Sequence, residues 1–95
     1  ISEENLAVVK EGMRQVVLSG TARDFANYPI PVAAKTGTAQ NSGSDHTTFI
    51  CFAPYDDPQI AISVVIAHGK SGMVSKNVAR DIMNSYFNIN PWIIL

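Results

Sequence analysis

The sequence has little of several features that mark common classes of protein. Its formal net charge is only −1, so it lacks the excess of positive charge with which proteins bind nucleic acid or anionic membranes. Its longest apolar run, residues 60–67, is too short for a helix that spans a bilayer, which needs about 20 residues. The chain begins ISEENLAVVKEGM, an amphipathic pattern from which we expect no signal peptide. Its 95 residues are expected to form one small domain or part of a larger one.

Cysteine and histidine are also scarce, which limits the available chemistry. The single cysteine, Cys51, excludes an internal disulfide, and its apolar neighbours predict an inert core residue. The short paired spacings typical of metal sites do not link the three candidate ligands, which are His46, Cys51 and His68. We therefore expect neither a metal nor another cofactor.

Two further polar motifs do not have the geometry that their chemistry requires. The segment HGKSG, residues 68–72, suggests a phosphate-binding loop, but such a loop needs a glycine where Val64 stands. Ser44, Asp45 and His46 are consecutive, so they cannot form the nucleophile, base and orienting group of a catalytic triad. We expect neither a nucleotide site nor a triad in this chain.

Apolar residues at helical spacing predict a helix near each end of the chain. The first helix has Ser2 as its N-cap and Gly20 as its C-cap, and its apolar stripe consists of Leu6, Val9, Met13, Val16 and Val17. The second helix begins near Met73, with Ser71 or Ser75 close to its start. Its apolar face consists of Val74, Val78, Ile82, Met83, Tyr86 and Phe87.

Three strands are predicted between the helices, over residues 32–40, 47–53 and 60–68. The turn residues PYDDPQ join the last two into an antiparallel hairpin. We predict an α+β fold in which three consecutive antiparallel strands are flanked by N- and C-terminal helices, with the first strand at an edge. Residues 60–67 are apolar at nearly every position, so the third strand should be covered on both faces and paired on both sides. The chain has too few elements for that, and is predicted to be part of a domain.

The most unusual polar residues lie in the first strand, which reads Lys-Thr-Gly-Thr at residues 35–38. Because side chains alternate along a strand, Lys35 and Gly37 share one face, and Thr36 and Thr38 share the other. Gly37 would leave space beside the ammonium for a reacting group, and the two hydroxyls could hold a carboxylate. An edge strand could also pair with an extended peptide. A surface lysine beside a bulge glycine explains the same residues without a function, and strand geometry alone does not decide between the two.

The motif and its surroundings resemble the class B penicillin-binding proteins, which are monofunctional, high-molecular-weight transpeptidases. AAKTGTAQ, residues 33–40, resembles the K-T-G box that these proteins share with β-lactamases. EGMRQVVLSGTA (11–22) is similar to the helix and turn before that box, FAPYDDPQIAISVVI (52–66) to the hairpin after it, and VSKNVARDIMNSYF (74–87) to the C-terminal helix. The resemblance covers about residues 5–87 and implies the five-stranded transpeptidase fold of penicillin-binding proteins and β-lactamases.

Two of the three motifs of this family are missing from the chain. No serine precedes a lysine by three positions, so the S-x-x-K motif that carries the nucleophile is absent. The S-x-N match at residues 75–77 follows the box instead of preceding it, and we interpret it as part of a helix start. The resemblance therefore implies that residues 1–95 are a partial domain. They would be the C-terminal segment of a transpeptidase domain, inactive without its N-terminal remainder.

The resemblance also implies roles for the residues of the box. Lys35 would supply positive potential to the substrate carboxylate and to the hydroxyl network around the absent serine. The hydroxyls of Thr36 and Thr38 would bind that carboxylate, and the Thr38 N–H would donate to the oxyanion. Ala39 and Gln40 would continue the backbone pairing with substrate. The implied site thus consists of Lys35, Thr36, Gly37, Thr38, Ala39 and Gln40.

The implied substrate is a peptidoglycan stem peptide ending in D-Ala-D-Ala, or a β-lactam that mimics it, and the implied reaction is acyl transfer through a serine ester. Such an enzyme would act at the extracytoplasmic face of the bacterial cell membrane, with its anchor outside this chain. Two alternatives stay open. One is a β-lactamase or β-lactam sensor of the same fold, and the other is a non-catalytic peptide-binding module.

Overall fold

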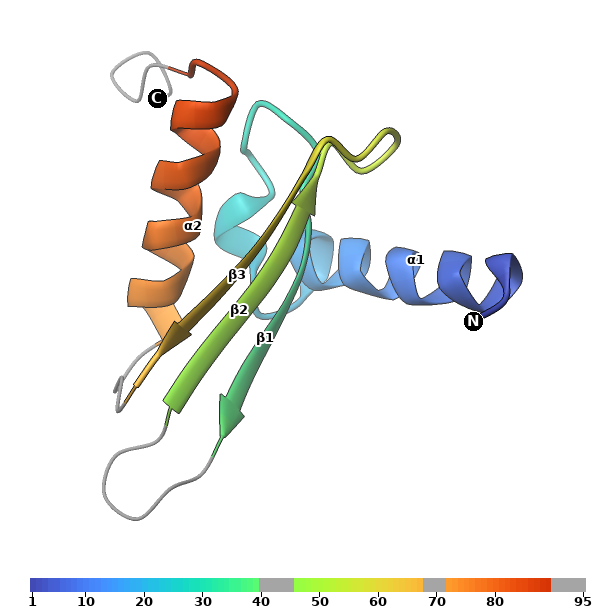
Figure 1. Ribbon diagram of the computed structural model, residues 1–95, viewed down its shortest axis with the longest axis horizontal. Helices are drawn as coiled ribbons and strands as arrows, with labels where there is room; N and C mark the ends of the chain where they lie inside the picture. Colours follow the sequence, from blue (N-terminus) through green and yellow to red (C-terminus); the bar gives the residue numbers. More distant parts are fainter. Residues whose placement is uncertain (40–45, 68–71, 90–95) are drawn as a thin grey trace. The chain divides into compact units, whose positions relative to one another are not determined.

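The computed structural model describes residues 1–39, 46–67 and 72–89, and the predicted elements occur there in the predicted order (Figure 1). The predicted elements are α1 (Glu3–Ser19), β1 (Ala33–Ala39), β2 (His46–Ala53), β3 (Ile60–Ile66) and α2 (Gly72–Tyr86). A short 3₁₀-helix, η1 (Arg23–Phe25), was not predicted and follows α1. Within these ranges the sheet has the order β1-β2-β3, and neighbouring arrows run in opposite directions (Figure 1). The predicted α+β class and the edge position of the first strand are confirmed. The first and third strands are slightly shorter than predicted, and Gln40 and His68 lie outside the described residues.

The chain divides into two compact units, and each strand contributes to both. The first unit contains residues Ile1–Thr36 and Ile50–Ile62, which include α1, η1 and the beginning of β1. The second unit contains residues Gly37–Phe49 and Ser63–Leu95, which include α2 and the rest of β1. Lys35 and Thr36 therefore belong to the first unit, whereas Gly37 and Thr38 belong to the second.

In the first unit, α1 begins and ends at the residues that the sequence predicts. The Asn5 N–H donates to Ser2 Oγ at 3.1 Å, which satisfies one of the unpaired amides of the first turn. Glu3 and Glu4 lie in that turn, where the helix dipole favours negative charge. At the other end the N–H groups of Gly20 and Ala22 both donate to the Val16 carbonyl, at 3.0 and 3.1 Å. Both predicted caps are confirmed.

Gly20 is required at the end of α1 because the backbone passes very close to the preceding turn. Its φ of −112° is open to any residue, but a Cβ atom there would lie 2.9 Å from both Cα and O of Val16. Backbone atoms cannot move aside as a flexible side chain can. We therefore expect Gly20→Ala to lower the free energy of unfolding by about 1–3 kcal/mol, the usual cost of overpacking.

The thermal unfolding midpoint of the complete protein that carries this chain would measure this cost. Gly12→Ala is the matched control, because Gly12 lies inside α1 with no atom within 4 Å of its added Cβ. Alanine is the better helix former by about 1 kcal/mol, so the control should raise the midpoint. Equal midpoints for the two variants would contradict the steric argument at Gly20.

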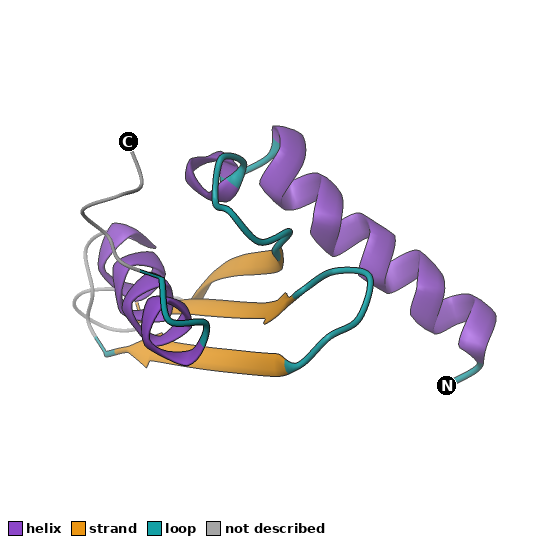
Figure 2. Ribbon diagram, turned by 90° about the horizontal axis from the view of Figure 1, so that it is seen from above, coloured by secondary structure: helices purple, strands orange, loops and turns teal. Residues whose placement is uncertain are grey.

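The apolar stripe of α1 is only partly buried. Val17 is fully buried, whereas Leu6 is 45% and Val9 51% exposed. Figure 2 shows that the N-terminal half of this helix extends beyond the strands of its own unit. The core of the first unit lies instead around η1, the start of β1 and the end of β2, and includes Val17, Ala22, Phe25, Tyr28, Val32, Ala33, Ala34, Cys51 and Ala53. The predicted stripe thus keeps considerable exposed area at Leu6 and Val9 in the described structure.

In the second unit, α2 buries a different stripe from the one predicted. Ser75, Ala79 and Met83 are buried, and of these only Met83 was predicted. Four predicted residues of the apolar face are 38–52% exposed, namely Val74, Val78, Ile82 and Tyr86. Adjacent positions on a helix are about 100° apart, so the prediction selected the stripe beside the buried one. Two of the three buried residues, Ser75 and Ala79, have small side chains.

α2 begins at Gly72, close to the predicted start near Met73. Ser75 is inside the helix, where its Oγ donates to the Gly72 carbonyl at 2.9 Å. It is a buried residue of the first turn, and Ser71 lies outside the described residues. The end of α2 has Asn88 in the left-handed region at φ 59°, and the Ile89 N–H donates to the Asn84 carbonyl at 2.8 Å, a Schellman arrangement.

β3 is covered on one face only, as predicted for a chain with too few elements to cover both faces of this strand. Ile62 and Val64 are buried, whereas the alternate residues Ala61, Ser63 and Val65 are exposed. Among the described residues, β3 pairs with β2 alone and so forms the second edge of the sheet. The apolar run of this strand is therefore left with an uncovered face and an unpaired side in the described structure.

No described helix is long and apolar enough to cross a membrane.

Candidate functional site

The Lys-Thr-Gly-Thr motif lies on β1, at an edge of the sheet formed by the described strands. Lys35 and Thr38 are exposed, while Thr36 and Gly37 are half-buried. An edge strand has backbone N–H and C=O groups that no neighbouring strand uses, so an extended peptide can pair with it. The motif therefore occupies the position that the sequence predicts for a peptide-binding strand. Ala39 closes β1, and Gln40 is not among the described residues.

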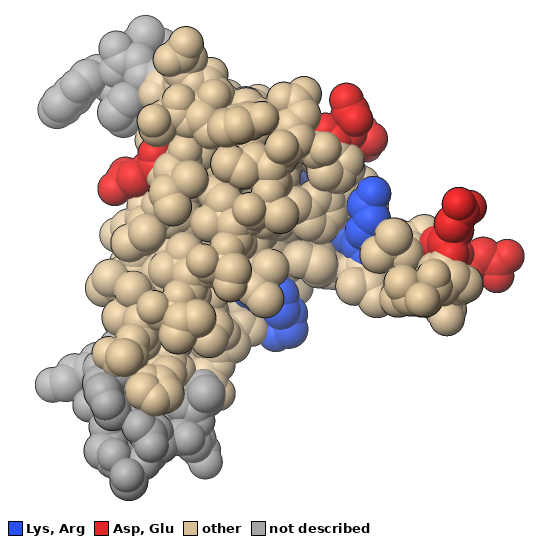
Figure 3. Space-filling model, in the orientation of Figure 1, with Lys and Arg blue, Asp and Glu red and all other residues tan. Residues whose placement is uncertain are grey.

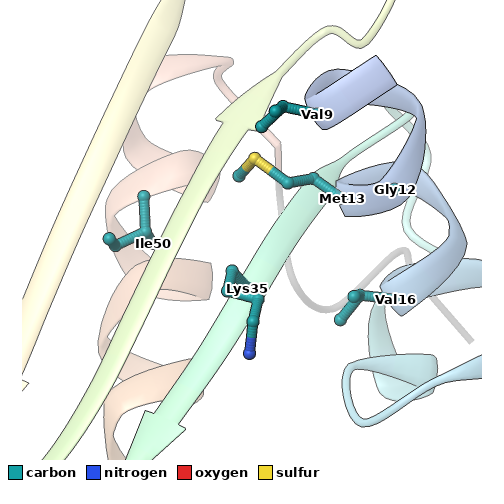
Figure 4. Close-up of a pocket in the computed structure, with 6 residues that line it drawn as sticks. All are labelled: Val9, Gly12, Met13, Val16, Lys35 and Ile50. Carbon is teal, nitrogen blue, oxygen red and sulfur yellow. The ribbon is translucent and has the colours of Figure 1, made fainter. Parts of the chain in front are cut away.

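Lys35 lies beside an apolar cavity of about 520 Å³ within the first unit. Figure 4 shows side chains of α1 pointing toward the strands, with Lys35 on β1 and Ile50 on β2 opposite them. The lining residues are Val9, Gly12, Met13, Val16, Lys35 and Ile50, of which Lys35 is the charged one. The Lys35 Nζ donates to the Thr36 carbonyl at 2.6 Å. Its aliphatic stem can cover apolar surface while the ammonium stays at the polar rim.

Thr36 has a partner that sequence analysis missed. Its Oγ1 lies 2.6 Å from Oγ1 of Thr21, and either hydroxyl can be the donor. Thr21 follows the C-cap of α1 and precedes η1. No spacing rule connects two threonines that are 15 residues apart, so only the packing of the turn against β1 reveals the pair.

The space predicted beside Gly37 does not exist in the structure. A Cβ atom on Gly37 would lie 2.5 Å from Oγ1 of Thr48, its cross-strand neighbour on β2. The expectation of room for a reacting group next to the glycine is therefore wrong, because the Thr48 hydroxyl fills that place. The glycine instead permits the close approach of a side chain from the adjacent strand.

This close approach predicts an energetic coupling between positions 37 and 48. Gly37→Ala should lower the free energy of unfolding by about 1 kcal/mol, because the Thr48 side chain must rotate away from its preferred position. Adding Thr48→Ala removes the hydroxyl and should recover most of that loss. A double-mutant cycle measured by denaturant unfolding of the complete protein tests the coupling. Strictly additive effects of the two substitutions would show that the contact with Thr48 does not cause the loss of stability in Gly37→Ala.

Of the other candidate residues, Cys51 is the one whose predicted place the structure tests. Cys51 is fully buried, and burial raises the pKa of its thiol to about 11, so the thiol is neutral at physiological pH and poorly nucleophilic. The prediction of an inert core cysteine is confirmed. His46 is half-buried at the start of β2, while Ser44, Asp45 and His68 lie outside the described residues. The part of the chain that the structure describes holds no group of metal-ligating residues.

The face drawn in Figure 3 shows no gathering of basic side chains. On the face drawn in Figure 3, the basic and acidic side chains are separated from one another by uncharged residues. Lys10 lies with its Nζ 5.8 Å from the centre of the Phe52 ring, and Arg14 donates from Nη1 to the Val32 carbonyl at 2.7 Å. These two cations of α1 are thus engaged in contacts within the first unit, as Lys35 is through the Thr36 carbonyl.

Comparison with known proteins identifies the family. Residues 1–84 match the model of the penicillin binding protein transpeptidase domain. The chain is 35% identical over 103 residues to penicillin-binding protein 2B of Streptococcus pneumoniae, covering 96% of this chain and 15% of that protein. It is 32% identical over 96 residues to the peptidoglycan D,D-transpeptidase MrdA of Escherichia coli K12, covering 81% of this chain and 15% of that protein.

A solved structure gives the same answer. The crystal structure of Pseudomonas aeruginosa PBP2 in complex with WCK 5153 superposes with a TM-score of 0.79 at 39% identity, covering 90% of this chain and 20% of that chain. The chain thus spans about 15% of the length of the curated relatives it matches. The predicted resemblance to class B proteins, and the fold that it implied, are confirmed. The chain belongs to the penicillin-binding protein transpeptidase domain family.

Proposed function

We propose that the complete protein is a peptidoglycan D,D-transpeptidase and that this chain supplies the strand against which the substrate binds. The observation that carries the proposal is the position of Lys-Thr-Gly-Thr on an exposed edge strand, with Lys35 pointing beside an open cavity. The family name, penicillin binding protein transpeptidase domain, and the D,D-transpeptidase relative support the same activity.

The proposed reaction has two acyl transfers. A serine outside this chain attacks the carbonyl between the two terminal D-alanines, and the last D-alanine leaves, so that a serine ester remains. An amine of a neighbouring stem peptide then attacks the ester, forms the cross-link and releases the serine. Within this chain, the Thr38 N–H would donate to the oxyanion of each tetrahedral intermediate. Losing one such donor typically costs about 3–4 kcal/mol of transition-state stabilisation.

The substrate would bind as an additional strand along β1. Its backbone would pair with free groups of the edge, and residues Ala39 and Gln40 would extend that pairing. Its terminal carboxylate would accept hydrogen bonds from the hydroxyls of Thr36 and Thr38, and Lys35 would add positive potential. Gly37 would keep β1 close to β2 and so hold the flanking residues in register. A β-lactam would use the same contacts, since it presents a carboxylate next to a reactive carbonyl.

The proposed partners follow from this role. The nucleophile must come from the N-terminal remainder of the same domain, since no S-x-x-K motif occurs in these 95 residues. We expect the complete protein to be anchored in the bacterial cell membrane by a segment outside this chain, with its transpeptidase domain on the extracytoplasmic side. The proposed chemistry requires no metal or other cofactor.

Reaction of the complete protein with penicillin tests the proposal. We expect a stable covalent adduct by intact mass spectrometry, together with cross-linked product from a D-Ala-D-Ala stem peptide and an amine acceptor. An adduct that hydrolyses within seconds would assign a β-lactamase instead. A stable adduct without any cross-linking would favour a β-lactam sensor, and no adduct at all would favour a non-catalytic peptide-binding module.

A further inference from the structure

Thr21 is held in a fixed position at the end of α1. On one side of it, Gly20 is pressed against Val16, where an added Cβ would collide with the backbone. On the other side, Ala22 is fully buried, and its N–H donates to the Val16 carbonyl. Thr21 itself is exposed. The turn therefore fixes the backbone of Thr21 while leaving its side chain accessible.

The same turn is tied to β1. The Phe25 N–H donates to the Ala22 carbonyl at 3.0 Å, and the buried Phe25 ring anchors η1. The side chain of Arg14 on α1 donates to the carbonyl of Val32 at 2.7 Å, one residue before β1 begins. These contacts all lie within the first unit, so the distance between the turn and β1 is set by the packing of that unit. The Thr21 and Thr36 hydroxyls meet at 2.6 Å as a result.

When a substrate carboxylate is bound, hydrogen-bond chemistry decides which of the two hydroxyls, Thr21 or Thr36, is the donor in this pair. A carboxylate can only accept, and a threonine hydroxyl has one proton to donate. If Thr36 donates its proton to a carboxylate, it can only accept from Thr21. Thr21 must then be the donor in the pair, and a hydroxyl that accepts one hydrogen bond becomes a stronger donor in the next.

We propose that Thr21 is a positioning residue for the substrate carboxylate, because its hydroxyl donates to Thr36 and thereby directs the Thr36 proton toward the ligand. This inference rests on the proposed function, in which Thr36 binds the carboxylate. Thr21 touches no substrate atom in this scheme and acts through Thr36 alone. Its effect should therefore be confined to ligands that carry a free carboxylate.

The test compares benzylpenicillin with its methyl ester on the complete transpeptidase. The second-order rate constant of acylation is measured for the unmodified protein, Thr21→Val and Thr21→Ser. Thr21→Val should slow acylation by the acid about three- to tenfold, the value of one lost hydrogen bond. It should change the ester rate less than twofold, and Thr21→Ser should restore the rate with the acid. The matched control is Ser19→Ala at the same end of α1. It removes an exposed hydroxyl, which donates to the Gln15 carbonyl.

Each outcome bears on one claim only. Equal slowing of acid and ester by Thr21→Val would mean a merely structural role and would overturn the inference. Unchanged rates with both acid and ester, together with a clear preference for the acid in the unmodified protein, would overturn it as well and leave the proposed function intact. No preference for the acid in the unmodified protein would instead overturn the assignment of Thr36 as a carboxylate ligand.

Discussion

Replacing Lys35 with alanine should slow acylation of the complete protein by penicillin by about two to three orders of magnitude. Preorganised charges and donors in an active site typically contribute that much when one is removed. Lys35 is exposed on an edge strand, and its ammonium has the Thr36 carbonyl as a hydrogen-bond acceptor. Its removal leaves no buried group unpaired, so the thermal unfolding midpoint should stay nearly unchanged.

Stopped-flow acylation with a chromogenic β-lactam, together with the unfolding midpoint, measures both parts of this expectation. Lys10→Ala is the matched control, because it removes the same charge from α1, where the ammonium contacts the Phe52 ring. The control should acylate at the normal rate. If Lys35→Ala reacted as fast as the control, Lys35 would have no role in the site. A large fall in the unfolding midpoint would mean that the lysine stabilises the fold instead.

Residues 1–95 expressed alone should be poorly soluble or oligomeric and should form no covalent adduct with penicillin. The described sheet has β1 and β3 as its two edges, and unprotected edges are templates for pairing with other chains. Val65 on β3 is 64% and Ile50 on β2 is 48% exposed, so the strands carry exposed apolar side chains. Burial of such surface is worth about 25 cal/mol per Å², which favours association in a domain of marginal stability.

The absence of an adduct follows from a separate feature, the lack of an S-x-x-K motif in the sequence. Size-exclusion chromatography with light scattering tests the first part, and intact mass spectrometry after incubation with penicillin tests the second. A monodisperse monomer with a cooperative melt would refute the argument from exposed edges. A covalent adduct would refute the argument from the missing nucleophile, and neither result would affect the other.

Local features of the chain were predictable because their causes are local. Ser2 and Gly20 define the ends of α1 through contacts within four residues, and the Pro- and Asp-rich turn defines the hairpin of β2 and β3. The edge position of β1 followed from short connections between consecutive strands. The Lys-Thr-Gly-Thr motif could be placed on that edge for the same reason.

The features that could not be predicted depend on tertiary contacts between elements that are separate in the sequence. The periodicity of α2 shows a broad apolar arc but not which stripe of it is buried, and Ser75 and Ala79 were missed because small residues give a weak hydrophobic signal. The approach of Thr48 to Gly37 is a cross-strand contact, and the Thr21–Thr36 pair joins a turn to a strand.

The hydrogen bond from Lys35 to its neighbouring carbonyl has a consequence for the entropy of ligand binding. A lysine side chain has four rotatable bonds, and ordering them on binding costs up to about 1.5–2 kcal/mol. Because the Lys35 Nζ is already held by the Thr36 carbonyl at 2.6 Å, much of that ordering precedes the arrival of a ligand. The ammonium could exchange the Thr36 carbonyl for the carboxylate of the proposed ligand without first being immobilised. More of the attraction between ammonium and carboxylate would then be retained as affinity.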